Sequence, residues 1–119
     1  MKAGFPSPAD DHIEEKLDLN RLMIEHPAAT FFLRVEGDSM ENANIQPGDI
    51  LVVDRALTPK NEQIVVAILN GEFTVKRMKT QEDRLFLLPE NPRFPALEIT
   101  AETDFQIWGV VTYIIHKAR

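Results

Sequence analysis

From residue 30 onward, turn signals divide the sequence into short apolar runs, and this pattern most constrains the fold. The runs are rich in Val, Ile, Leu, Phe and Thr, which favour β-strands, and they are separated by Gly, Pro and Asn, which favour turns. The predicted strands occupy residues 30–36, 49–54, 63–69, 73–78, 84–88 and 105–115. We therefore expect a mainly β fold that is compact and strongly twisted.

The dipeptide Asn70-Gly71 gives the clearest local prediction, because it separates two of these runs. A type I′ turn needs positive φ at both central positions, which Asn and Gly adopt most easily, so a hairpin is expected here. In its second strand, alternation places Thr74 and Lys76 on one face. Phe73, Val75 and Arg77 then lie on the other.

The residues before the first strand suggest an arm followed by a short helix. Residues 1–11 contain three Gly or Pro residues and one large apolar side chain, so we expect a flexible, extended arm. Asp18 is a suitable N-cap for a helix over residues 19–25, and Pro27 would stop it. This helix is expected to cover one edge of the sheet, within a single domain spanning residues 12–119.

The amino-acid composition makes some classes of protein function less suitable for this chain. The chain has 119 residues and a net charge of −6, which argues against coating nucleic acid and favours protein partners. It has no cysteine, so disulfides and thiolate metal sites are excluded and a reducing compartment is tolerated. No apolar run approaches the roughly 18 residues of a membrane span. A soluble cytoplasmic protein without a cofactor is expected.

Metal binding is a weak alternative. Asp10, Asp11, Glu14 and Glu15 form an acidic cluster, but such a cluster is usually a solvated face. The histidines, at positions 12, 26 and 116, lack ligand spacing and are expected to be ordinary surface residues.

A serine in a tight turn, Gly37-Asp38-Ser39-Met40, follows the first apolar run. A hydroxyl becomes a good nucleophile only beside a base, and Lys76 could be that base if burial lowered its pKa from about 10.4 towards neutrality. Holding a lysine neutral near pH 7 costs roughly 4 to 5 kcal/mol. Each residue alone has an ordinary interpretation as a turn residue or a solvated edge residue, and a non-catalytic β module remains an alternative.

Several segments in register resemble the LexA/UmuD family of self-cleaving serine-lysine peptidases. They are residues 34–40 (RVEGDSM), 48–54 (GDILVVD) and 71–77 (GEFTVKR), with the lysine 37 positions after the serine. Residues 4–8 (GFPSP) resemble the family's cleavage region. Residues 17–20 (LDLN), 26–30 (HPAAT) and 108–111 (WGVV) are similar to its UmuD-like branch, so the resemblance covers essentially the whole chain.

The resemblance implies a fold like the LexA C-terminal peptidase domain and a catalytic dyad. Ser39 would be the nucleophile and Lys76 the general base, with the backbone N–H groups of Ser39 and Met40 stabilising the oxyanion. Asp38 is not needed. The bond between Ala3 and Gly4 stands at the family's cleavage position, and because three residues precede it, the chain is expected to be the processed form or a short version.

The resemblance also implies a role in the bacterial response to DNA damage. The chain would be a homodimeric accessory subunit of an error-prone Y-family DNA polymerase, meeting the RecA filament in its longer form. The last apolar run, residues 105–115, is apolar on both faces in strict alternation, so it is either a dimer surface or a strand buried within one subunit. The alternative is the dimerisation and self-cleavage domain of a LexA-like repressor, which residues 87–91 (LLPEN) resemble.

Overall fold

The computed structural model describes residues 16–37, 45–91 and 93–118. Before the sheet come a helix, α1 (Leu19–Met23), and a 3₁₀ turn, η1 (Pro27–Ala29). The strands are β1 (Thr30–Arg34), β2 (Ile50–Asp54), β3 (Ile64–Leu69), β4 (Glu72–Gln81), β5 (Arg84–Leu88), β6 (Leu97–Ile99) and β7 (Phe105–Ile115). The mainly β prediction is confirmed. Only the short β6 was not predicted, and β4 continues three residues beyond its predicted end.

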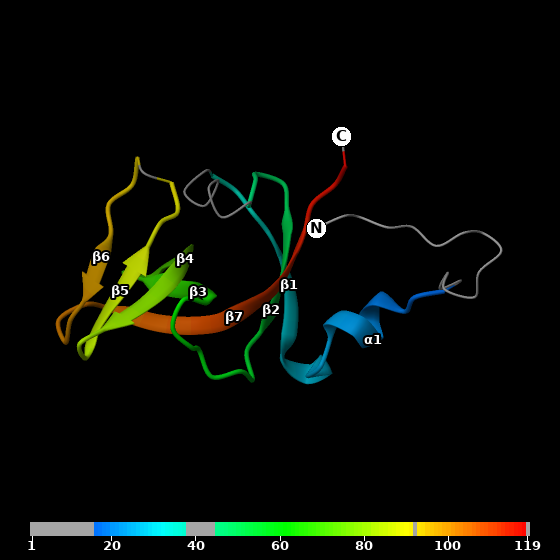
Figure 1. Cartoon of the computed structure of the whole chain (residues 1–119), viewed down its shortest axis with the longest axis horizontal. Coiled ribbons are helices and arrows are strands. Elements are labelled where there is room, and N and C mark those ends of the chain that lie inside the picture. The colour runs from blue at the N-terminus through cyan, green and yellow to red at the C-terminus, as the bar shows by residue number, and fades with distance from the viewer. Residues whose placement is uncertain (1–15, 38–44, 92, 119) are drawn as a thin grey trace, which may run out of the picture.

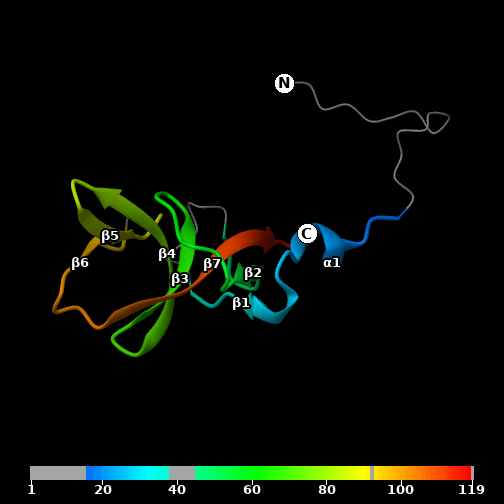
Figure 2. The same cartoon turned by 90° about the horizontal axis from the view of Figure 1, so that it is seen from below.

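The described strands form one antiparallel sheet in the order β1-β2-β7-β3-β4-β5-β6. β7 is the long curved strand that passes through the middle of the molecule (Figure 1), and the view from below shows it between β3 and β2 (Figure 2). The hairpin between β3 and β4 turns at Asn70 (φ 51°) and Gly71 (φ 81°), which confirms positive φ at both positions.

The sheet buries apolar side chains on both faces, because successive residues of β3 point in opposite directions. Val66 belongs to one cluster, with Ile45, Leu51 and Val53 at its centre. Its neighbours Val65 and Ala67 belong to the other, with Met78, Leu87 and Val110. Strands that are buried on both faces read as continuous apolar runs, which is how β2 and β3 appear in the sequence.

Two β-bulges break the strict alternation that was predicted for β7. Val66 pairs with Gly109 and Ala67 with Ile107, so Trp108 is an extra residue opposite β3. Thr112 is likewise extra opposite β2, and its hydroxyl donates to the carbonyl of Val52 (3.2 Å). Each extra residue shifts the face of those that follow. Trp108, Val111 and Ile114 therefore pack on one cluster, and Ile107 and Val110 on the other.

The position of β7 also bears on its predicted role. One edge pairs with β2 over Val110–Ile115 and the other with β3 over Phe105–Val110, and the middle of the strand is buried. Its C-terminal end is more accessible, since Tyr113 and Ile115 are 40% and 39% exposed. On the β3 side, residues 111–115 have no partner strand within the described chain, so this half of the edge is available to a dimer surface together with the end of β7.

The helix begins as predicted but ends two residues early. Asp18 caps α1 by accepting from the backbone N–H groups of Asn20 (3.0 Å) and Arg21 (3.4 Å). The expectation that the helix covers an edge of the sheet is wrong for this single chain, because no residue of α1 is buried. A five-residue helix offers little apolar surface, and Leu22 stays 52% exposed. The hydroxyl of Tyr113 donates to the carbonyl of Leu22 (3.4 Å).

The part of the chain that the structure describes contains no helix long and apolar enough to cross a membrane. The arm expected at residues 1–11, with Ala3 and Gly4, lies outside the described residues.

Candidate active site

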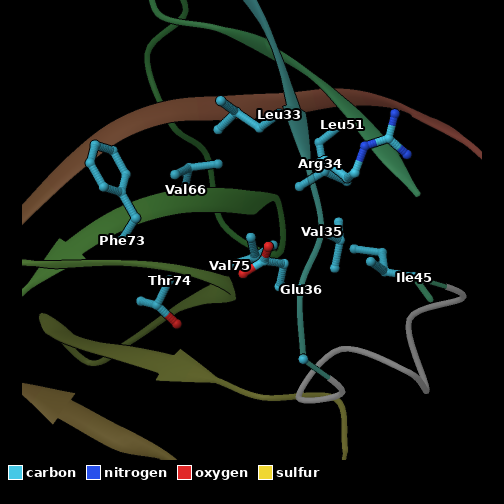
Figure 3. A pocket seen from close by; sticks show the side chains of 11 residues that line it. Leu33, Arg34, Val35, Glu36, Ile45, Leu51, Val66, Phe73, Thr74 and Val75 are labelled. Atoms are coloured by element: carbon cyan, nitrogen blue, oxygen red, sulfur yellow. The ribbon is translucent and has the colours of Figure 1, made fainter. Parts of the chain in front are cut away.

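A cleft of about 300 Å³ lies between the end of β1 and the β3-β4 hairpin. Figure 3 shows Phe73, Thr74 and Val75 of β4 across this cleft from Leu33, Val35 and Ile45. The other lining residues are Arg34, Glu36, Gly37, Leu51 and Val66. Most of the lining residues are apolar and a few are polar, a composition that is common in ligand-binding sites.

The loop that follows β1 is fastened at its base. The N–H of Val35 donates to the carbonyl of Asp49 (2.8 Å), and the N–H of Gly48 donates back to the carbonyl of Val35 (2.9 Å). Ile45 then anchors the returning chain in the core with 1% of its surface exposed. The predicted site residues Ser39 and Met40 belong to this loop but lie outside the described residues, as does Asp38.

One edge of β4 is open where it borders the cleft. β4 pairs with β3 over Glu72 to Arg77, but with β5 only from Arg77 onward. On the β5 side, residues 72–76 therefore have no partner strand within the described chain. Met78 exchanges backbone hydrogen bonds on the β3 side, so the backbone groups of Phe73 and Val75 face the open edge.

Lys76 lies on this open stretch of β4, and its face is the predicted one. Val75 packs in one cluster and Met78 in the other, so Lys76 shares the face of Met78. Its side chain is half-buried, and burial lowers the pKa of the Lys76 ammonium. Within the described residues Lys76 has no carboxylate partner, whereas Arg77 pairs with Glu90 and Lys79 with Glu62.

Residues 1–112 match the Peptidase S24-like family. The chain belongs to that family. Protein SamA of Salmonella typhimurium is 52% identical over 117 residues, covering 98% of this chain and 81% of SamA. Protein MucA of Escherichia coli is 47% identical over 114 residues, covering 95% of this chain and 77% of MucA. LexA repressor 1 of Geobacter sulfurreducens is 44% identical over 115 residues, but these cover only 56% of the repressor.

These matches confirm the resemblance to self-cleaving peptidases that the sequence motifs indicated. Family membership assigns the chain to a class of peptidases, and it leaves the dyad of Ser39 and Lys76 as a prediction. Lys76 is the predicted catalytic residue that the structure describes, and it is half-buried on an open strand edge.

This S24-like domain also contains two histidine-aspartate pairs that were not predicted. The aspartates serve turns: Asp49 accepts from the N–H of Gln46 and Asp54 from that of Ala56, both at 2.8 Å. Each buried carboxylate also binds a histidine. His116 Nδ1 lies 2.6 Å from Asp49, and His26 Nδ1 lies 2.7 Å from Asp54.

The hydrogen bond to Asp54 raises the pKa of His26. Burial alone would raise the pKa of Asp54, but hydrogen bonds from His26 and from the N–H of Ala56 outweigh it and lower that pKa. The interpretation of His26 and His116 as ordinary surface residues is therefore incomplete, because the pairs join positions that are distant in sequence. His12 lies outside the described residues.

No group of three potential metal ligands occurs in the described ranges. The acidic cluster Asp10, Asp11, Glu14 and Glu15 lies outside them.

Proposed function

We propose that this chain is a self-cleaving serine-lysine peptidase in which Lys76 is the general base for Ser39. The observation that carries the proposal is the state of Lys76: half-buried, on an open strand edge directly after the β4 residues that line the cleft, and without a carboxylate partner in the described chain. A carboxylate would hold the ammonium protonated, whereas burial favours the neutral amine that a base requires.

Chain connectivity supports the pairing. Gly37 lines the cleft together with Thr74 and Val75, and Ser39 follows Gly37 by two residues. The chain segment that leads to Ser39 thus lines the same cleft as the β4 residues that precede Lys76.

The proposed chemistry uses the dyad twice. Neutral Lys76 takes the proton from the hydroxyl of Ser39 as its oxygen attacks the carbonyl carbon of Ala3, and the N–H groups of Ser39 and Met40 stabilise the oxyanion. The Lys76 ammonium then protonates the departing amine of Gly4 as the C–N bond breaks, leaving an ester on Ser39. Lys76 next deprotonates a water molecule, which hydrolyses the ester and releases the serine.

The open edge of β4 offers a place for the peptide that is cut. An extended segment that adds to residues 72–76 would pair with the free backbone groups of Phe73 and Val75. Pro6 and Pro8 favour an extended arm. We propose that the arm around Ala3 and Gly4 binds in this way, in the same chain or in a second copy.

For the biological role, we propose a cytoplasmic accessory subunit of SOS mutagenesis, acting on an error-prone Y-family DNA polymerase and responding to the RecA filament. The support is the UmuD-like resemblance of the motifs, together with identities near one half to SamA and MucA over almost the whole chain. The net charge of −6 favours protein partners over direct binding to DNA.

We further propose that the chain is a homodimer that uses an exposed aromatic surface. Trp108 lies 5.2 Å from the ring of Phe31 and 5.6 Å from that of Phe73, and these two phenylalanines are 42% and 61% exposed. The guanidinium of Arg55 lies 4.5 Å from the Trp108 ring centroid, and its Nε donates to the Trp108 carbonyl (2.8 Å). Aromatic residues and arginine dominate the centres of protein interfaces.

A second candidate is the dimerisation and self-cleavage domain of a LexA-like repressor, favoured by the 44% identity to LexA repressor 1. Purification of the tagged chain from DNA-damaged cells separates the two roles. Recovery of a polymerase supports the accessory subunit, whereas recovery of operator DNA with a longer precursor supports the repressor.

Cleavage in trans tests the peptidase. The substrate is this chain with Ser39→Ala and a carrier protein fused ahead of Met1, and it is mixed with the active chain from about pH 6 to 10. We expect cutting between Ala3 and Gly4 at a rate that rises about tenfold per pH unit below the pKa of Lys76.

The test compares two lysines of β4, with Lys76 as the proposed base and Lys79 as the matched control. Lys76→Ala in the active chain abolishes cutting, whereas Lys79→Ala, which removes a partner of Glu62, leaves it unchanged. A rate that is flat with pH, or that survives Lys76→Ala, would overturn the dyad.

A further inference from the structure

The turn that follows β5 brings an aromatic ring to Lys76. The Nζ of Lys76 lies 5.7 Å from the ring centroid of Phe94, and Phe94 is 37% exposed. Lys76 and Phe94 come from different elements, since one is on β4 and the other lies between β5 and β6. The ring is thus a neighbour of the amine that the sequence pattern alone does not reveal.

This turn is built to hold its shape. Asn91 is 6% exposed, and its side-chain oxygen accepts from the N–H of Arg93 (3.0 Å). The carbonyl of Asn91 accepts from the N–H of Phe94 itself (3.1 Å). An Asn side chain that accepts a hydrogen bond from the backbone two residues later stabilises the turn and fixes the direction of the chain that follows it. Asn91 therefore helps to position Phe94.

The turn is also attached to β4 next to Lys76. Glu90 pairs with Arg77, the residue that follows the lysine, and Arg77 Nη1 donates to the carbonyl of Glu62 (2.6 Å). The turn that carries Phe94 is thus held by the buried Asn91 and by the ion pair of Glu90 with Arg77. This ion pair lies where the pairing of β4 with β5 begins.

We propose that Phe94 is a positioning residue for Lys76, whose ring covers the amine and holds it at the open edge of β4, shielded from bulk water. This inference rests on the proposed function, because it is that function which gives Lys76 a catalytic task. The contact between Phe94 and Lys76 does not depend on it. The ring acts through Lys76 and is not assigned any contact with the peptide.

Two effects of the ring oppose each other. Shielding from water favours the neutral amine, whereas the negative face of the ring attracts the ammonium. At 5.7 Å the amine is near the roughly 6 Å limit of that attraction, and burial lowers the pKa of Lys76, so we infer that shielding is the larger effect. The charged groups nearby are Arg93, whose guanidinium lies 6.0 Å from the same centroid, and Arg77, which is offset by Glu90.

The test titrates Lys76 directly, by NMR of the ¹³C-labelled lysine side chain in the whole protein. We expect Phe94→Ala to raise the pKa of Lys76, and Phe94→Leu, which keeps apolar cover without the ring face, to leave it near or below the wild-type value. Phe86→Ala is the matched control. Phe86 also faces a cation, since the Arg84 guanidinium lies 5.2 Å from its ring centroid, but this ring does not face Lys76. It leaves the Lys76 titration unchanged.

Cleavage in trans provides the second measurement. A rise of one unit in the pKa of Lys76 lowers the rate near pH 7 about tenfold, and the variant recovers at alkaline pH. An unmoved Lys76 titration and pH profile in folded Phe94→Ala protein would overturn the inference while leaving the dyad intact. A shifted titration in a protein that shows no Lys76-dependent cutting would uphold the contact and overturn the proposed function.

Discussion

Gly109 of β7 lies against the end of β2, and the structure predicts that even one methyl group there is disruptive. A Cβ on Gly109 would lie 2.5 Å from Cγ1 of Val53 and 3.3 Å from Cγ of Arg55. The Arg55 side chain is exposed and can move, but Val53 has no exposed surface. Its β-branched side chain is held in one rotamer by the core, so the backbone of β7 or β2 must shift instead.

Overpacking of this kind costs about 1 to 3 kcal/mol in the free energy of unfolding. For a chain of this length, 1 kcal/mol corresponds to about 4 °C in melting temperature, so Gly109→Ala is expected to lower Tm by about 4 to 12 °C. Urea unfolding gives the free energy, and all variants are compared at one protein concentration because dimerisation would add to apparent stability.

A double-mutant cycle tests the stated cause. Val53→Ala removes the atom that the new methyl group would strike, so Gly109→Ala should cost at least about 1 kcal/mol less in that background. Gly71→Ala is the control: its Cβ would have nothing within 4 Å, and its φ of 81° makes the cost one of backbone strain, which Val53→Ala leaves unchanged. An equal cost of Gly109→Ala in both backgrounds would refute the packing argument.

Two further predictions concern the His26 pair and the aromatic surface. The pKa of His26 is raised above 6.5 and that of Asp54 is lowered below 3.8. The contribution of this pair to the free energy of unfolding is therefore fully present between pH 3.8 and pH 6.5, and it is lost as pH rises through the folded pKa of His26. His26→Gln should therefore lower stability more at about pH 5.5 than at about pH 8.5; an equal loss in urea unfolding contradicts this. Trp108→Ala should weaken the homodimer in sedimentation equilibrium at least tenfold, whereas Phe86→Ala should not; an unchanged dimer constant places the interface elsewhere.

Local sequence signals predicted the elements that depend on neighbours in the chain. The Asn70-Gly71 turn, the Asp18 cap and the apolar runs of β5 and β7 need only their own residues, so their positions were predictable. β6 has three residues, too few to form a recognisable run, and it exists because it pairs with β5 and because Arg84 binds Glu98.

Features made by distant residues were not predictable from one sequence. The bulge at Trp108 belongs to the pairing of β7 with β3, and it places Ile107 and Val110, three positions apart, in the same cluster. The pairing of His116 with Asp49 spans 67 positions. For the site, alternation correctly predicted the face of Lys76, but the ring of Phe94 reaches it through a turn whose geometry no periodicity expresses.

The central position of β7 has a consequence for biosynthesis. In the sheet, β1 and β2 connect to the four strands from β3 to β6 only through β7, which is made after all of them. On the ribosome the two parts would wait as separate, incomplete sheets, each with an open apolar edge, until residues 105–115 leave the exit tunnel. The cleft lies between β1 and the β3-β4 hairpin, so it forms only when β7 joins them. If the chain is the self-cleaving peptidase proposed above, its activity would begin only with the completion of the last strand.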